Sequence, residues 1–383
     1  MKIRWAGACA AALLLSLASS RVWADIKVGI TISATGPGSA LGQPQLKTGP
    51  ALPKEIAGEK ITYIILDDES DPTKGTQNAR RLVLEQGVDA IVGSSLTPVT
   101  LPIIDIASES KTPMVTLAAA TSIVQPMDEK RKWVFKVVPN DDIMVSAILK
   151  RIVKSGVRTL GYIGVSDGYG EGYYKELSRI APELGLTLTT HEVYARSDMS
   201  TAGQALKTIV TNPDAVFIAS AGTPAVLPQK DLRERGYIGQ IYQTHGVATD
   251  EFIKLGGADV DGAIFAGEAF TIADDLDPSD PLRRATDEFI TAYKAANGAK
   301  PNIFGAHLWD AVALITRAIP NALKSAKPGT PEFRAALRDE LEQGKNVYLN
   351  NGLSNMSPTN HNGYDERSAF LIKVDGGKFR LLK

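Results

Sequence analysis

The sequence has little of what several kinds of catalytic chemistry need. Its 383 residues include a single cysteine, Cys9, and four scattered histidines. Cys9 lies near the start, in a segment that we expect to be removed, so the mature chain would have neither disulfides nor a thiol nucleophile. The patterns G-x-x-x-x-G-K-S/T and H-E-x-x-H are also missing, and with them the usual residues of nucleotide hydrolysis and zinc peptidase chemistry. We expect neither a cofactor nor a metal.

An excess of positive charge is missing as well. The chain has 42 basic and 43 acidic residues. Without Lys2, Arg4 and Arg21, which fall in the removable segment, 39 basic residues remain against 43 acidic ones, a net charge of −4. A chain of this balance lacks the basic surface that nucleic-acid binding requires, so we expect no nucleic-acid partner.

The N-terminus predicts export. Lys2 and Arg4 give a positive start, residues 6–18 are almost wholly apolar or small, and Ala24 ends the small-residue pattern that signal peptidase reads. A transmembrane anchor is the alternative, but it needs about 20 apolar residues, and polar residues within 16–21 interrupt the run too early. We predict a signal peptide over residues 1–24, cleavage after Ala24 and a soluble product in the periplasm.

Length and periodicity predict an α/β fold. About 360 mature residues exceed what one hydrophobic core usually supports, so two domains are expected. Short β-rich runs alternate with amphipathic stretches, which is typical of parallel sheets covered by helices. We predict one sheet from 26–33, 61–67, 90–95 and 114–118, with helices at 76–86 and 98–110, and a second sheet from 159–165, 187–195, 215–220, 241–244 and 263–266.

Three helical stretches follow the second series, at 282–297, 305–323 and 331–343. They have no partner strands of their own, so we expect them to return and cover the first lobe. A last strand at 368–374 ends in a Gly-Gly turn. Because the chain has no low-complexity linker, we expect several short crossovers, rather than one flexible linker, to join the lobes. The predicted fold is therefore α/β with two Rossmann-like lobes.

One short pattern favours a different function, a secreted serine hydrolase. Residues 164–168 match the G-x-S-x-G nucleophile elbow around Ser166. Such an enzyme also needs an acid and a histidine later in the chain. The candidates are Asp250, Asp310, His245, His307 and His361. None carries a signature of its own, and two glycines are frequent in α/β turns. We keep the hydrolase as an alternative and expect a protein that is not an enzyme.

A series of motifs along the whole mature chain resembles one family. The motifs are Asp25-Ile26-Lys27-Val28-Gly29, Ser33-Ala34-Thr35-Gly36-Pro37-Gly38, Leu66-Asp67-Asp68 with Asp71-Pro72, Gly93-Ser94-Ser95, and Asp167-Gly168-Tyr169-Gly170-Glu171-Gly172. Their order and spacing are similar to those of the type I periplasmic solute-binding proteins of branched-chain amino acid ABC transporters. The resemblance implies two lobes joined by three crossovers, a ligand in the cleft, and lobe closure that signals to permease subunits in the inner membrane.

The resemblance also implies how the chain is divided. The N-terminal lobe would comprise residues 25–140 and 271–347, and the C-terminal lobe residues 141–270 and 348–383, with a crossover at each boundary. We expect a monomer. A sensory receptor domain of the same fold is a further alternative, but it would need a separate membrane partner.

The family holds its ligand carboxylate after the third strand. That place falls here on Thr97, within the turn from Ser94 through Ser95 and Leu96 to Thr97, whose backbone N–H groups and threonine hydroxyl would donate charge-assisted hydrogen bonds. Thr97 is equally well placed as a helix N-cap, and both roles are compatible, because an N-cap turn is itself an anion site.

The next strand end supplies further partners in the family. It falls here on Ala118, Ala119, Ala120 and Thr121. Ala120 stands where the amino-acid binders have an ammonium-binding hydroxyl, and Thr121 comes one residue late. This sequence therefore lacks the ammonium-binding hydroxyl at that position.

Four further positions describe the pocket walls. Tyr169 and Phe304 match aromatic walls, although Tyr169 could be a loop residue and Phe304 a core residue. Leu41 stands where amino-acid binders often have a tyrosine, and Ala221-Gly222 replaces another bulky aromatic region. The loss of two rings opens space for a flat ligand.

His245 stands where the amino-acid binders carry a glutamate for the ligand ammonium group. An unpaired ammonium in a closed cleft costs several kcal/mol or more, and neutral histidine cannot replace that charge. It can hydrogen-bond to a phenol, a carbonyl or a second carboxylate, unless it is merely structural. These departures resemble the branch of the family that takes up aromatic carboxylates. The resemblance implies a small carboxylate ligand, an aromatic acid of the benzoate or hydroxycinnamate type, with a branched-chain amino acid as the alternative.

Overall fold

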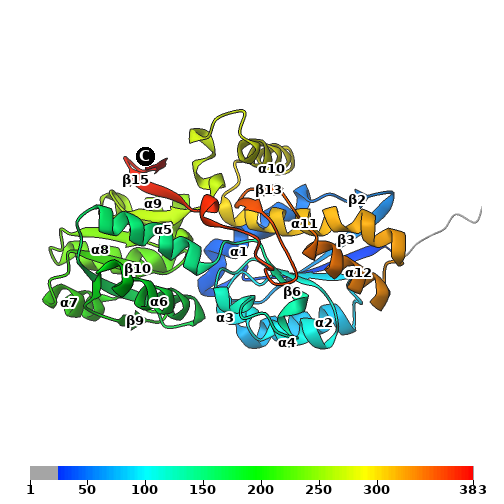
Figure 1. Cartoon of the computed structure of the whole chain (residues 1–383), viewed down its shortest axis with the longest axis horizontal. Helices are drawn as coiled ribbons and strands as arrows, with labels where there is room; N and C mark the ends of the chain where they lie inside the picture. The colour runs from blue at the N-terminus through cyan, green and yellow to red at the C-terminus, as the bar shows by residue number, and fades with distance from the viewer. Residues whose placement is uncertain (1–24, 383) are drawn as a thin grey trace, which may run out of the picture.

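Two α/β lobes lie side by side in the computed structural model, which describes residues 25–382 (Figure 1). The predicted signal peptide lies outside the described residues. Each lobe is built on one mostly parallel sheet. Within residues 25–382, we find no helix that combines the length and the apolar character needed to cross a membrane.

The first lobe contains a six-stranded sheet in the order β2-β3-β1-β4-β5-β6. Its strands are β1 (Ile26–Ile32), β2 (Glu55–Ile56), β3 (Glu59–Asp67), β4 (Ala90–Val92), β5 (Met114–Thr116) and β6 (Val134–Lys136). Neighbouring strands are parallel except for β2 and β3. Strand β1 is buried along nearly its whole length, as expected for a central strand covered on both faces.

The helices beside this sheet come from two distant parts of the chain. They are α1 (Ser39–Thr48), α2 (Pro72–Leu84), α3 (Thr97–Thr100), α4 (Ile103–Glu109), α10 (Pro281–Asn297), α11 (Ile303–Ser325) and α12 (Pro331–Glu342). Helix α11 packs against α1, α12 and β4 (Figure 1). The Asn302 side chain accepts hydrogen bonds from the N–H groups of Phe304 and Gly305, which fixes the start of α11.

The second lobe contains a larger sheet in the order β16-β15-β12-β11-β10-β7-β8, with β9 also paired to β7. Its strands are β7 (Thr159–Val165), β8 (Thr187–Leu188), β9 (Glu192–Tyr194), β10 (Ala215–Ala219), β11 (Gln240–Gln243), β12 (Ile264–Gly267), β15 (Phe370–Asp375) and β16 (Lys378–Leu381). Strands β15 and β16 are antiparallel to their neighbours. The helices are α5 (Asp141–Lys154), α6 (Gly168–Ile180), α7 (Ala202–Val210), α8 (Val226–Glu234) and α9 (Asp250–Gly256).

The chain passes between the lobes three times. The first passage leads from β6 to α5 and the second from β12 towards α10. The third follows a small hairpin of β13 (Val347–Leu349) and β14 (Gly352–Ser354). The N–H of Lys136 donates to the carbonyl of His361 at 3.0 Å, and the Asn362 side chain donates to the carbonyl of Val138 at 2.7 Å. The chain thus stays beside β6 as far as Asn362, well past the boundary expected between residues 347 and 348.

The lobes touch at two places along the cleft. A β-carbon at Gly222, which has a φ of +69°, would lie 3.0 Å from Leu41 Cδ1. A β-carbon at Gly168, at the start of α6, would lie 3.2 Å from Thr97 Cγ2. Both distances are tighter than ordinary van der Waals contact, so glycine allows the lobes to approach this closely. The cleft is therefore closed.

The observed elements differ from the predicted ones at particular points. The predicted strand 187–195 is two short strands, β8 and β9, which pair with different parts of β7. The predicted helix 98–110 is divided into α3 and α4, because Pro102 lacks the N–H that a continuous helix would use. Strand β6 (Val134–Lys136), at the edge of the first sheet, was not predicted.

Candidate ligand-binding cleft

The closed cleft contains a cavity with about 320 Å³ of empty space, including the part that opens to solvent. Both lobes contribute to its walls. They are Leu41, Ser95, Leu96, Thr97, Leu117, Ala119, Val138, Tyr169, Arg196, Ala221, His245, Gly246, Phe304 and His307. Most of the polar members follow the carboxyl ends of parallel strands, which is where open α/β sheets bind ligands.

The structure brings most of the predicted site residues together. Leu41, Ser95, Leu96, Thr97, Ala119, Tyr169, Ala221, His245 and Phe304 line the cavity, whereas Ala118, Ala120, Thr121 and Gly222 do not. Gly222 forms the rim contact with α1. Thr121 caps α5 instead, since its N–H donates to Asp141 Oδ2 at 3.1 Å and its hydroxyl accepts from the Asp141 N–H at 3.0 Å. Alternate residues of an extended segment face opposite ways, and here Leu117 and Ala119 face the cavity.

Side-chain hydrogen bonds hold in place the turn that is predicted to bind a carboxylate. The Ser94 hydroxyl donates to Asp68 Oδ2 at 2.7 Å, and the Ser95 hydroxyl donates to the Gln45 side chain. Thr97 differs, because its Oγ1 is buried and no atom of residues 25–382 lies at hydrogen-bonding distance and angle from it. The uncommitted hydroxyl of this turn therefore belongs to Thr97, not to Ser95.

A guanidinium group that the sequence analysis missed also lines the cavity. Arg196 follows β9, and its Nε donates to Asp167 Oδ2 at 2.6 Å. The guanidinium carbon is 5.8 Å from the centre of the Tyr169 ring, and Tyr169 is the neighbour of the glycine that contacts Thr97. Arginine has five N–H donors, so its bonds to Asp167 leave donors for a ligand.

His245 lies in the second lobe, in the 3-10 helix η7 (His245–Val247). Its Nδ1 is 3.4 Å from the Tyr173 hydroxyl oxygen and 3.6 Å from Glu268 Oε1. Burial lowers the pKa of His245 to about 3 and raises the pKa of Glu268 to about 8, so both are neutral near pH 7. Glu268 is not among the residues that line the cavity, which therefore presents no anion at this place.

Helix α11 brings Phe304 and His307 into the cavity. Residues three positions apart lie on one helix face, and here the ring centres are 5.5 Å apart. His307 is 2% exposed, and neither ring nitrogen has a hydrogen-bond partner among residues 25–382, although Asn351 is near enough to influence its pKa. Burial lowers the pKa of His307 to about 3. The sequence analysis had considered His307 only as a hydrolase residue.

Ser166 of the G-x-S-x-G pattern lies away from the residues that line the cavity. It is exposed and does not line the cavity. Its N–H donates to the Tyr194 carbonyl at 2.8 Å. Of its predicted partners, Asp310 accepts hydrogen bonds from the side chains of Asn350 and Asn351 instead. The described residues thus do not assemble a catalytic triad around Ser166, and no group of three or more metal-ligating side chains occurs among them.

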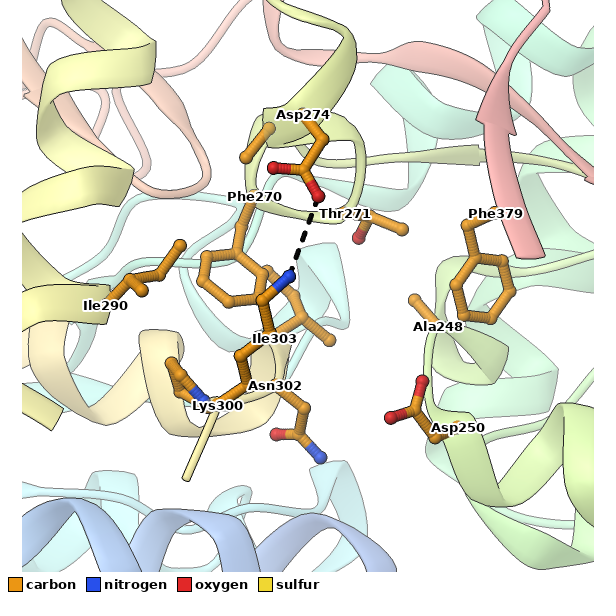
Figure 2. A pocket seen from close by; sticks show the side chains of 12 residues that line it. Ala248, Asp250, Phe270, Thr271, Asp274, Ile290, Lys300, Asn302, Ile303 and Phe379 are labelled. Atoms are coloured by element: carbon orange, nitrogen blue, oxygen red, sulfur yellow. Dashed lines mark ion pairs between the residues drawn. The ribbon is translucent and has the colours of Figure 1, made fainter. Parts of the chain in front are cut away.

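A second, larger hollow lies at the seam between the lobes, with about 710 Å³ of empty space, solvent included. Figure 2 shows Lys300 and Ile303 of the first lobe on one side and Asp250 and Phe379 of the second lobe on the other. Lys300 Nζ is 3.6 Å from Asp274 Oδ2, and both side chains are more than half exposed. The predicted ligand-binding residues do not line this hollow, although Asp250, a candidate acid of the hydrolase alternative, does.

Fold and cleft together define a two-lobed α/β binding protein. A family model described as periplasmic binding protein matches residues 25–378. The chain therefore belongs to the periplasmic binding protein family, and it is a periplasmic-type ligand-binding receptor of the kind that works with ABC transporter permeases.

Comparisons with individual proteins agree with this family. Leu/Ile/Val-binding protein homolog 3 of Brucella melitensis biotype 1 is 24% identical over 371 residues, 94% of each chain. An extracellular ligand-binding receptor from Rhodopseudomonas palustris HaA2 is 69% identical, with a TM-score of 0.93 over 94% of this chain and 100% of that one. A solute-binding protein from R. palustris in complex with benzoate is 20% identical, with a TM-score of 0.79 over 94% and 95%. The last likeness shows the fold alone.

Proposed function

We propose that the chain is the periplasmic receptor of an ABC importer for a small aromatic carboxylate of the benzoate or hydroxycinnamate type. One observation carries this proposal: the cavity walls include a guanidinium and an uncommitted hydroxyl but no carboxylate. A ligand carboxylate would accept charge-assisted hydrogen bonds from Arg196 and a hydrogen bond from Thr97. The ammonium of an amino acid would find no anion, and burying it unpaired costs several kcal/mol or more.

The remaining walls suit a flat, apolar ligand body. Tyr169 and Phe304 supply aromatic surface, and Leu96, Leu117 and Val138 supply aliphatic surface. Small-molecule sites typically combine such walls with a few convergent polar groups. The benzoate complex of a protein with the same fold supports this ligand class. The Leu/Ile/Val-binding relatives support the alternative, a branched-chain amino acid.

The ligand would act by holding the closed cleft together. Thr97 and Phe304 come from elements of the first lobe, and Tyr169, Arg196 and His245 from the second. A ligand that contacts both lobes binds the closed form better than the open form and shifts the population towards it. We propose that the lobes are residues 25–140 with 271–347 and residues 141–270 with 348–383, except that the return passage is better placed after residue 362.

The deciding experiment is a ligand screen on the mature chain, expected to be a monomer that starts at Asp25. Differential scanning fluorimetry followed by calorimetry would compare benzoate and 4-hydroxycinnamate with leucine, isoleucine and valine. Because a ligand that binds only the folded state stabilises it by mass action, an aromatic acid should raise the melting temperature and the three amino acids should not. The reverse pattern would reject the aromatic-acid proposal in favour of the amino-acid alternative.

Ser166→Ala provides the control for the screen. Since Ser166 is exposed and away from the cavity, this variant should bind like the wild type. The same variant tests the hydrolase alternative, because ester turnover by the wild type that disappears in Ser166→Ala would replace the receptor by an enzyme.

A further inference from the structure

We infer that His307 and His245 together form a neutral oxygen-binding end of the cavity, so that the preferred ligand is an aromatic acid with a second, uncharged oxygen far from its carboxylate. This inference rests on the proposed function and narrows its substrate class. His307 is a specificity-determining residue in this account, and the sequence analysis had not assigned that role to it.

The first support is the unsatisfied chemistry of His307. The side chain is 2% exposed, and both ring nitrogens lack a hydrogen-bond partner among residues 25–382. Buried polar atoms are nearly always paired, because leaving one unpaired forfeits its hydration without a replacement. His307 lines the cavity and also lies beside the Asn351 side chain. Asn351 can satisfy at most one ring nitrogen, so a ligand atom in the cavity is the partner for the other.

The second support is that the two histidines come from different lobes. His307 is carried by α11, which packs on the first lobe, and His245 by η7 of the second lobe. Both rings line the same cavity. A ligand oxygen that formed hydrogen bonds with both rings would therefore join the two lobes.

Charge distinguishes the two ends. Arg196, paired with Asp167, supplies a permanent cation to the cavity wall. At the histidine end burial keeps both rings uncharged, and the Glu268 side chain behind His245 holds its proton near pH 7. A neutral imidazole offers one donor and one acceptor. That pair matches a hydroxyl, and its donor matches a carbonyl, whereas an ammonium or a second carboxylate would remain uncompensated.

Calorimetry with matched ligands tests the inference. The pairs are benzoate with 3- and 4-hydroxybenzoate, and cinnamate with 3- and 4-hydroxycinnamate. Wild type should bind at least one hydroxylated member about tenfold more tightly than its parent acid, which is the effect of one buried hydrogen bond. His307→Phe, which keeps the ring and removes both nitrogens, should reduce the preference to within about twofold. His307→Gln, which keeps a donor and an acceptor, should retain part of it.

Arg317→Ala is the matched control, because Arg317 lies on the same helix with an exposed side chain. It should leave every affinity unchanged. Equal wild-type affinities within both sets, or an equal loss of parent and hydroxylated acids in His307→Phe, would overturn the inference while the receptor proposal stands. If no aromatic acid bound to the wild type, the inference and the proposed function would both be rejected. The wild-type affinities for the parent and hydroxylated acids test the inference even if His307→Phe does not fold.

Discussion

The two hollows between the lobes differ in what their polar groups need. The seam hollow is the larger, with about 710 Å³ of empty space against about 320 Å³ for the cavity. Yet its charged residues Lys300, Asp274 and Asp250 are exposed, and Lys300 faces Asp274, so they gain little from a ligand. In the cavity, Thr97 and His307 are each 2% exposed and lack partners for their polar atoms. We therefore propose the cavity, whose walls carry unsatisfied buried polar groups, as the binding site in preference to the larger hollow.

One residue lies between the two hollows. Glu268 contacts His245 of the cavity, and it directly precedes the 3-10 helix η9 (Ala269–Asp275), which lines the seam. It also belongs to the second passage between the lobes. A change in the charge of Glu268 would therefore affect the cavity, the seam and this passage between the lobes together.

Glu268→Gln should have the largest effect. Burial raises the pKa of Glu268 from its usual 4.5 to about 8, so between these values the folded state keeps a proton that the unfolded chain has lost. Stability should therefore fall as the pH rises from about 4.5 to about 8. The full shift corresponds to roughly 3–5 kcal/mol. Because glutamine is neutral at every pH, urea unfolding should show the variant more stable than wild type at pH 8.5 and closer to it at pH 5.

The control for this pH dependence is Glu251→Gln, on the exposed face of α9. It should follow the wild-type curve. If Glu268→Gln were instead less stable than wild type at pH 8.5, Glu268 would be needed as an anion, and the cavity would no longer be neutral at its far end.

Arg196→Gln should have the next largest effect, on affinity. Loss of the guanidinium removes the charge-assisted bonds to the ligand carboxylate, which should weaken binding of the preferred aromatic acid by about a hundredfold or more. The variant also leaves Asp167 without its partner at 2.6 Å, so its melting temperature should fall. Combining it with Asp167→Asn should restore stability but not affinity. Full affinity of the double variant, measured by calorimetry, would place the carboxylate elsewhere.

Thr97→Val should have a smaller effect, because it removes one hydrogen bond and preserves shape. Affinity for the aromatic acid should fall by about tenfold, and the melting temperature without ligand should not fall, since the hydroxyl has no partner within residues 25–382. Thr97→Ser keeps the hydroxyl and should bind nearly as wild type does. An unchanged affinity in Thr97→Val would show that the turn contributes shape alone.

The family resemblance predicted Thr97, Tyr169 and His245, which come after β4, β7 and β11, where the carboxyl ends of parallel strands share one edge. Arg196 also directly follows a predicted strand, 187–195, but it was missed because the resemblance assigned no site residue there. In the segment after β5, Ala119 lines the cavity and Ala120 does not, a choice of side that composition does not reveal.

His307 and Glu268 were missed for other reasons. His307 lies three residues after Phe304 on α11, so the predicted pocket role of Phe304 and the i, i+3 spacing could have indicated it. Glu268 is buried only because the second passage runs between two closed lobes. Hydrophobic periodicity reports which face of an element is buried, but not which distant element covers it.

The smallest effect is expected at the seam. Lys300→Ala removes an ion pair whose side chains are 67% and 75% exposed, so it should change the free energy of unfolding by no more than about 0.5 kcal/mol and the affinity by no more than about twofold. Calorimetry would measure the affinity and urea unfolding the free energy of unfolding, with Thr97→Val measured in parallel. A tenfold loss of affinity in Lys300→Ala would mean that the ligand also uses the larger hollow, and volume would then have been the better guide after all.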